Sequence, residues 1–211
     1  EDDIARLFHT SNGIRTYSAL AITGEIPRIA HEYGLPVCAG AWLGRERDIA
    51  GKPVENKNRD EIDALIAIAN SVPVDCVIVG NEVLLRGDLT EAELLAYIQE
   101  VKAAVDVPVT TAEIGGILRN HPAVIDAIDL IMIHIYPFWD RQSIDGAVNE
   151  VVQTYLQWRD DYPNKRIVIG ETGWPSDGPT RGQAVPNPEN QRRFFYEFLA
   201  AAEQHDIEFY Y

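Results

Sequence analysis

Short apolar runs alternate with amphipathic segments along almost the whole chain. The runs are rich in β-branched residues, a pattern that is typical of strands buried on both faces. Runs of this kind occupy 14–18, 37–43, 77–79, 108–113, 130–136, 167–169 and 207–211. The sequence therefore predicts seven strands that lie mostly inside the protein.

The segments between these runs have helical periodicity. Between residues 62 and 69, apolar side chains recur at i, i+3, i+4 and i+7, so they share one face of a helix. Thr90 and Glu93 have the spacing of a capping box, and Thr23 is expected to cap another helix. Helices are expected at 1–10, with Ile4, Leu7 and Phe8 on one face, and at 23–34, 62–69, 90–101, 123–127, 143–156 and 187–199.

Strict alternation of strand and helix predicts parallel strands joined by right-handed crossovers. The regular spacing favours a (β/α)8 TIM barrel over a doubly wound sheet, and residues 1–211 are expected to form a single catalytic domain. A doubly wound nucleotide-binding protein would carry a Gly-rich phosphate loop after its first strand, and we find none. The first residue falls in a helix and the last in a strand, so we expect a barrel truncated at both ends. It would lack its first strand and the end of its last.

Glu171 follows a buried run in an unusual position. Residues 167–169 are β-branched, Gly170 ends the run, and Thr-Gly-Trp-Pro follows the glutamate. A carboxylate here is poorly placed for packing but well placed to face a ligand beyond the carboxyl ends of parallel strands. The alternative interpretation is a solvated loop acid or a charge at a helix N-terminus.

Glu82 occupies the same kind of position, 171 − 82 = 89 residues earlier. It follows the apolar run 77–79, a glycine and Asn81. In a strand–helix repeat, both glutamates would lie on one rim of the sheet. Two carboxyl groups about 5 Å apart suit a retaining glycosidase, in which one donates a proton and the other attacks the anomeric carbon. The like charges would also separate their pKa values and so assign the two roles.

Composition and charge exclude some partners. With 211 residues, 46% apolar and 24% charged, the chain resembles an ordinary globular domain. A net charge of −15 and a pI near 4.6 argue against nucleic acid or an anionic membrane as partner, while neutral sugars stay open. No apolar run is long enough for a membrane span, and no signal peptide is recognisable.

The cysteines and histidines do not indicate a metal site. Cys38 and Cys76 each begin an apolar run, and buried free thiols are favoured over a bridge between strands. Neither belongs to a metal-binding motif. Histidines without metal-ligand spacing are His9, His31, His121, His134 and His205.

Six motifs resemble glycoside hydrolase family 17, the retaining β-1,3-glucanases and β-glucan transglucosylases. They run through most of the chain, and their wording is closer to microbial than to plant members. They are GIRTYS at 13–18, VGNEV at 79–83, TTAE at 110–113, HIYPFW at 134–139, GETGWPS at 170–176 and AVP-NPENQ-RF at 184–194.

The resemblance implies roles for four residues. Glu171 would be the nucleophile and Glu82 the general acid/base, in a mechanism that needs no cofactor. Asn81 would hydrogen-bond the sugar 2-hydroxyl, and Tyr136 would hold the nucleophile ionised and aligned. On pattern alone, Asn81 could instead be a turn residue and Tyr136 a core aromatic.

Aromatic residues at the predicted strand ends are candidates to stack on glucose rings. Trp174 is the strongest of them, although each could equally pack in the core. Glu113 closes its strand, where it could contact sugar hydroxyls or form a rim salt bridge. The aromatic candidates are Tyr17, Trp42, Phe138, Trp139 and Trp174.

The expected function is therefore a retaining glycoside hydrolase that acts on β-1,3-glucan oligosaccharide or polysaccharide. Two alternatives stay open: a β-glucan transglucosylase that uses the same two glutamates, and a non-catalytic glucan-binding or scaffold barrel. The family resemblance implies a place in the cell envelope, the periplasm or the extracellular space. The residues themselves address neither that compartment nor the oligomeric state.

Overall fold

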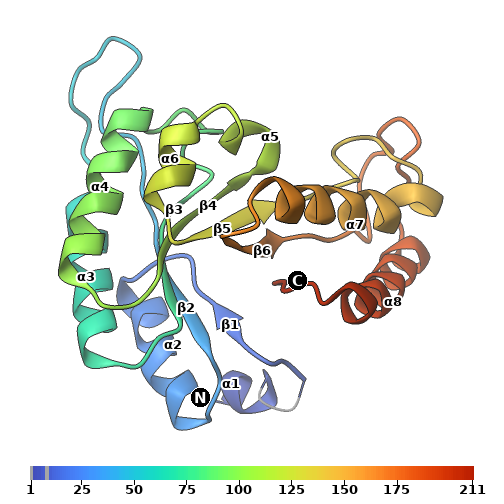
Figure 1. The fold of residues 1–211 in the computed structure, drawn as a ribbon, viewed down its shortest axis with the longest axis horizontal. Helices are drawn as coiled ribbons and strands as arrows, with labels where there is room; N and C mark the ends of the chain where they lie inside the picture. The colour runs from blue at the N-terminus through green and yellow to red at the C-terminus, as the bar shows by residue number, and fades with distance from the viewer. Residues whose placement is uncertain (1, 8–9) are drawn as a thin grey trace. The chain divides into compact units, whose positions relative to one another are not determined.

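A computed structural model describes residues 2–7 and 10–211 of the chain (Figure 1). Glu1, Phe8 and His9, which the sequence placed in or next to the first helix, lie outside the described residues. The chain divides into two compact units, 1–131 and 132–211, which are described in turn. The single catalytic domain expected from the sequence stays a prediction.

Unit 1 is a parallel sheet in which neighbours along the chain are also neighbours in space. Parallel pairing joins the first four strands in sequence, and Asp129 N donates to Val109 O (2.8 Å) where the fifth strand begins. This sequential order is that of a barrel rather than a doubly wound sheet. The strands are β1 (Ile14–Arg15), β2 (Val37–Ala41), β3 (Cys76–Asn81), β4 (Val109–Ile114) and the start of β5 (Leu130–His134).

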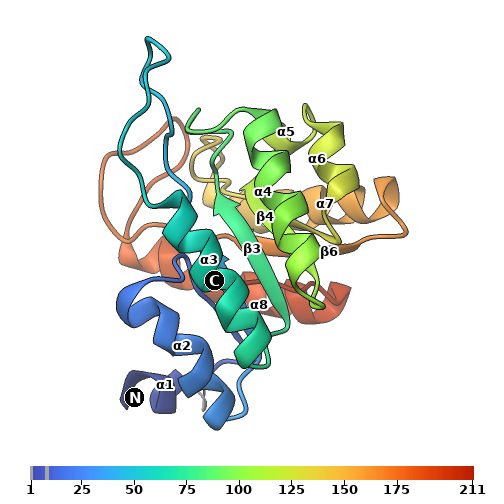
Figure 2. The ribbon, with the colours of Figure 1, turned by 90° about the vertical axis from the view of Figure 1, so that its left-hand side faces the viewer.

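The helices of unit 1 follow the strands and pack against them, as Figures 1 and 2 show for α3 and α4 beside β3. Leu65 and Ile98 are wholly buried, so the apolar faces predicted for α3 and α4 do face the sheet. The helices are α1 (Asp2–Leu7), α2 (Ala21–Glu32), α3 (Asn58–Ser71), α4 (Glu91–Ala104), α5 (Gly115–Leu118) and α6 (Pro122–Ala127).

The predicted helix caps have mixed outcomes. The capping box at the start of α4 is confirmed, because Glu93 N donates to Thr90 Oγ1 (3.3 Å) and Thr90 N donates to Glu93 Oε2 (2.8 Å). The prediction that Thr23 caps a helix is wrong. Helix α2 already begins at Ala21, and the Thr23 hydroxyl donates to Leu20 O (2.6 Å) from inside the helix.

The two cysteines form a disulfide, so the expectation of free thiols is wrong and the alternative of a bridge between strands is confirmed. Cys38 in β2 and Cys76 in β3 are directly opposite each other in the parallel register, with Cα atoms 4.6 Å apart. That spacing lies within the range a disulfide spans. The bond therefore crosslinks neighbouring central strands of unit 1.

A long loop connects β2 to α3 and extends away from the helices of unit 1 (Figure 2). Residues 44–58, which include most of this loop, are mostly polar or charged. An antiparallel bridge pairs Arg47 with Pro53, and Asn58 at the start of α3 binds both backbone groups of Gly44. The loop is thus closed at its base and pinned to the end of β2.

Unit 2 contains the end of β5, β6 (Arg166–Glu171) and two long helices, α7 (Ile144–Asp161) and α8 (Pro188–His205). Asn187 caps α8 through its side chain, which accepts from Asn190 N (2.7 Å), and Pro188 occupies the first turn as predicted. The expected strand at 207–211 is reduced to an isolated parallel bridge between Ile169 and Phe209. No helix in the described part of the chain is long and apolar enough to cross a membrane.

Candidate functional site

Glu82 lies in an irregular turn at the end of β3 in unit 1. The register of β3 against β4 shifts between Ile78 and Asn81, and Gly80 in this interval has φ +80°. A Cβ on Gly80 would lie 2.9 Å from Val83 Cγ1, so glycine is required there. Glu82 itself has φ +51°, a left-handed conformation that is uncommon for a residue with a side chain. The backbone therefore departs from regular strand geometry at this glutamate.

Backbone hydrogen bonds and one arginine hold this turn. Glu82 N donates to Ala112 O of β4 (2.8 Å), and Arg86 N donates to Glu82 O (2.9 Å). The Arg86 guanidinium donates to Asn81 O, to Leu43 O (2.7 Å) beyond the end of β2, and to Asp88 Oδ2 (2.8 Å). The ends of two neighbouring strands are thus tied to the residues that flank Glu82.

Asn81 has a fixed amide orientation. Arg15 Nη2 donates to Asn81 Oδ1 at 2.7 Å, and both residues are buried. Because a guanidinium can only donate, the atom that faces it must be the amide oxygen, and the NH2 group points the other way. The Arg15 guanidinium also lies 4.5 Å from the centroid of the Tyr17 ring, and Tyr17 is 42% exposed. Three side chains at the ends of β1 and β3 are therefore assembled together.

Glu113, for which the sequence left open a contact with sugar hydroxyls or a rim salt bridge, is buried. The residue is 1% exposed, and its carboxylate accepts from the backbone N–H groups of Leu84 (3.0 Å), Leu85 (3.2 Å) and Ile114 (2.9 Å). Burial, and less strongly the charge of Glu82, raise the pKa of Glu113 above its ordinary value, although the three N–H donors lower it. Glu113 is thus an internal anchor and not an open sugar ligand.

Trp42 is, like Tyr17, a partly exposed aromatic residue of unit 1. Its side chain lies beyond the end of β2, is 43% exposed, and carries the Arg86 guanidinium 4.5 Å from its ring centroid. Its backbone N–H donates to the buried carboxylate of Glu61 (3.2 Å), which also binds the N–H of Ala19 (2.7 Å). The indole is therefore held from both its backbone and one face of its ring.

Glu171 ends β6 in unit 2, and its side chain is 17% exposed. Tyr136 Oη donates to Glu171 Oε2 at 2.6 Å, and the buried His134 places Nε2 3.6 Å from Oε1. Ile135 N donates to the backbone oxygen of the glutamate (3.0 Å). Two side chains from the β5 segment thus face the two carboxylate oxygens, one at each.

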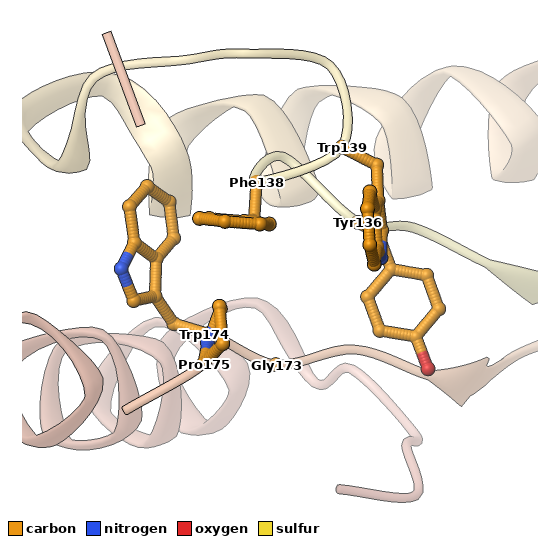
Figure 3. Close-up of a pocket in the computed structure, with 6 residues that line it drawn as sticks. All are labelled: Tyr136, Phe138, Trp139, Gly173, Trp174 and Pro175. Carbon is orange, nitrogen blue, oxygen red and sulfur yellow. The ribbon is translucent and has the colours of Figure 1, made fainter. Parts of the chain in front are cut away.

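A pocket of about 230 Å³ lies next to Tyr136 in unit 2 (Figure 3). Figure 3 shows Phe138 between Trp174 on one side and Trp139 and Tyr136 on the other. Trp174 is 3% exposed, and its Nε1–H donates to Val185 O (3.0 Å). The lining consists of Tyr136, Phe138, Trp139, Gly173, Trp174 and Pro175.

These positions correct the expectation for the aromatic residues of unit 2. Trp174 and Phe138 are buried, with ring centroids 5.4 Å apart in an edge-to-face contact, so they form a wall rather than open platforms. Trp139 is 57% exposed and is the open aromatic here. The guanidinium of Arg181, from the loop after β6, lies 4.3 Å from its ring centroid.

Sequence reasoning missed three residues that hold these groups: Arg86, Arg181 and His134. His134 had a usable signal, because it lies two residues before Tyr136 and alternate residues of a strand share a face. The two arginines lie in turns, where no periodicity indicates a partner. Within either unit taken by itself, the described residues also include no group of three His, Cys, Asp or Glu side chains close enough to hold one metal ion.

Comparison with known proteins identifies relatives of the whole chain. Residues 1–211 match the family described as the BtgE/BtgC glycoside hydrolase domain. A glucan 1,3-beta-glucosidase of Schizosaccharomyces pombe is 30% identical over 219 residues, which cover 95% of this chain and 66% of that protein. The chain thus spans slightly less than two thirds of the length of this relative.

Two solved structures of a protein from Rhizomucor miehei share the fold. One is a glycoside hydrolase family 17 beta-1,3-glucanosyltransferase, and the other is its active-site mutant in complex with laminaritriose. Each is 26% identical, covers 100% of this chain and 78% of its own, and gives a TM-score of 0.83. The resemblance to glycoside hydrolase family 17 and the (β/α)-barrel class are thereby confirmed.

Proposed function

The chain belongs to the BtgE/BtgC glycoside hydrolase domain family, and from that premise we propose that it is a retaining enzyme that cleaves β-1,3-glucan. Glu171 acts as the nucleophile and Glu82 as the general acid/base. The observation that carries this proposal is the 2.6 Å hydrogen bond from Tyr136 Oη to Glu171 Oε2. This charge-assisted hydrogen bond aligns the carboxylate for attack on a sugar.

The first step forms a covalent glycosyl-enzyme. Glu82 donates its proton to the glycosidic oxygen, the bond from that oxygen to the anomeric carbon breaks, and a Glu171 oxygen bonds to the same carbon. The leaving chain departs as a neutral alcohol. The donor NH2 of Asn81, turned away from Arg15, supplies a hydrogen bond to the 2-hydroxyl that strengthens in the transition state.

The second step releases the sugar. Glu82, now a carboxylate, takes a proton from a water molecule, whose oxygen bonds to the anomeric carbon while the bond to Glu171 breaks. Two inversions restore the β configuration. This double displacement requires the two carboxyl groups to act about 5 Å apart, a separation that leaves no room for water between nucleophile and sugar.

Exposed aromatic side chains supply stacking surfaces for the glucose rings of the chain. Tyr17 and Trp42 in unit 1 and Trp139 in unit 2 each keep substantial ring surface exposed, and each has a guanidinium against its ring. A β-1,3-linked glucan as substrate is supported by the names of the S. pombe and R. miehei relatives, and by laminaritriose in one relative's structure.

The second candidate function is glucan transfer, which the R. miehei glucanosyltransferase favours. In this reaction a sugar hydroxyl replaces water in the second step, and Glu82 removes its proton instead. The residues of the first step are the same in both reactions. Hydrolysis and transfer therefore differ only in what reaches the glycosyl-enzyme.

The test is a product profile on laminari-oligosaccharides, with the wild type beside Glu171→Ala and Glu82→Ala. A matched control is Glu203→Ala, which removes an exposed carboxylate from α8. Shorter products alone indicate hydrolysis, longer products indicate transfer, and NMR should show β-anomers released first in either case. A folded wild-type chain that binds oligosaccharides without turnover would contradict the enzymatic function and favour a glucan-binding role.

A further inference from the structure

Glu113 is the most completely enclosed carboxylate near Glu82, and its surroundings are unusual. The residue closes β4 in unit 1 and is 1% exposed. Burying a carboxylate is unfavourable unless donors replace its water, and here three backbone N–H groups do so. Two of these donors, Leu84 and Leu85, belong to the turn that directly follows Glu82. The carboxylate is therefore bound to the very segment that carries the proposed acid/base.

That segment needs an external anchor. Glu82 adopts φ +51°, a conformation that costs free energy in a residue with a side chain and persists only where its surroundings impose it. Glu82 N donates to Ala112 O, and the N–H groups of Leu84 and Leu85, in the turn that follows, donate to the Glu113 carboxylate. Both anchors come from β4. The end of β4 therefore binds the bent backbone both at Glu82 and just after it.

We propose that Glu113 is a positioning residue for the reaction: by binding the N–H groups of Leu84 and Leu85, it fixes the direction in which Glu82 presents its proton to the leaving oxygen. Glu113 does not touch the sugar in this role and transfers no proton itself. The inference rests on the proposed function, because it takes Glu82 to be the general acid/base.

A purely structural role predicts something different. If Glu113 only stabilised the sheet, its loss would reduce the amount of folded protein and affect every substrate equally. If it positions the acid, its loss should harm only reactions that need the acid. A substrate whose leaving group departs without a proton separates the two roles. Glu171 still attacks it, while formation of the glycosyl-enzyme, the step that kcat/KM reports, no longer needs the proton of Glu82.

The perturbing variant is Glu113→Gln, which keeps the size of the side chain. Leu84 N and Leu85 N donate to Glu113 Oε2, whereas Ile114 N donates to Oε1. The NH2 group of glutamine accepts nothing, so it must face either the two turn donors or Ile114 N–H, and in both cases the side chain is pushed away from the backbone it holds. The turn should then relax. Glu113→Asp is a second variant: it keeps the charge, but its shorter side chain cannot reach all three donors. Glu93→Gln is the matched control, because Glu93 also binds backbone N–H but caps α4 instead.

The experiment compares kcat/KM on laminaritetraose with kcat/KM on a 2,4-dinitrophenyl β-laminaribioside. For Glu113→Gln we expect about a 100-fold loss on the oligosaccharide, the cost of a catalytic group misplaced by about 1 Å. We expect little loss on the dinitrophenyl substrate. Glu113→Asp should behave in the same way, and Glu93→Gln should change neither value. In a Glu82→Gln background, the Glu113 substitution should cause no further loss, because the group it positions is gone.

The possible results distinguish failure of the positioning role of Glu113 from failure of the proposed function. Equal losses on both substrates, from folded variants, would overturn the positioning role, and so would unchanged activity on the oligosaccharide. A loss that adds fully to that of Glu82→Gln would also overturn it. A folded wild type inactive on both substrates would overturn the proposed function itself, and the role of Glu113 with it.

Discussion

Replacing Tyr136 with phenylalanine should slow formation of the glycosyl-enzyme without unfolding the protein. The substitution removes one oxygen, the atom that donates to Glu171 Oε2 at 2.6 Å. The ring stays, so the wall of the neighbouring pocket keeps its shape. His134 Nε2 also stays, 3.6 Å from the other carboxylate oxygen. The perturbation is therefore confined to the alignment of the nucleophile and the hydrogen bond it accepts.

The expected magnitude follows from the kind of hydrogen bond that is lost. A hydrogen bond to a charged group contributes about 1.5–3 kcal/mol, which corresponds to about 10- to 150-fold in rate. The charge on Glu171 is partly neutralised as its oxygen bonds to the anomeric carbon, so the transition state keeps only part of this interaction. We therefore expect kcat/KM to fall towards the lower end, by about 10- to 50-fold.

The assay uses the same two substrates as for Glu113, the oligosaccharide and the dinitrophenyl glycoside. Here we expect losses on both substrates, whereas the Glu113 variants should lose activity on the oligosaccharide alone. Both substrates need the nucleophile, so Tyr136→Phe should reduce kcat/KM on both by similar factors. Tyr196→Phe removes the same atom from an exposed ring on α8 and is the control. An unchanged kcat/KM in a folded Tyr136→Phe variant, or a loss that Tyr196→Phe shares, would refute the reasoning.

Two further predictions concern stability and titration. The Cys38→Ala/Cys76→Ala double variant removes a crosslink that spans 38 residues, and loop entropy predicts a loss of about 4 kcal/mol, or roughly 8–16 °C in Tm; circular dichroism melting tests this, and an unchanged Tm would contradict it. Burial, with the hydrogen bond to Glu46, raises the pKa of Tyr97 to about 12. A tyrosine ionises near pH 10 in the unfolded chain, so the stability this phenol contributes is complete below about pH 10 and is lost as the pH rises towards 12. The absorbance at 295 nm is measured against pH for the wild type and for Tyr97→Phe. The difference between the two titration curves should have its midpoint near pH 12, and a midpoint near pH 10 would contradict the raised pKa.

The sequence was sufficient where local pattern controls structure. The alternating runs predicted the strands, because residues in parallel sheets covered on both faces are almost all apolar. Glu82 and Glu171 were recognisable because each interrupts that rule at a strand end. The Asn187-Pro188 helix start also followed from nearby residues alone. In each case, the relevant partner lies within a few positions along the chain.

The sequence was insufficient where the partner is distant or the backbone irregular. Whether Cys38 meets Cys76 depends on the register of two strands, and a shift of one residue would turn the two side chains to opposite faces. Two of the three donors to Glu113 lie 28 and 29 residues away, in a turn whose course no periodicity describes. The failed Thr23 cap has the same origin, because the left-handed Ala21 starts α2 earlier than its side chains indicate.

The two proposed catalytic glutamates are held in different ways, and the difference suits their roles. Glu171 ends a regular strand, and its carboxylate is contacted directly by Tyr136 and His134. A nucleophile must be aligned with the carbon it attacks, which contacts on the carboxylate achieve. The anchors described for Glu82 act on the backbone: its own N–H donates to Ala112 O, and the N–H groups of the nearby Leu84 and Leu85 donate to Glu113. A general acid must give up and regain a proton in every cycle, and anchoring the backbone fixes its direction without competing for that proton. Substitutions around Glu171 should therefore affect every substrate, whereas those around Glu82 should depend on the leaving group.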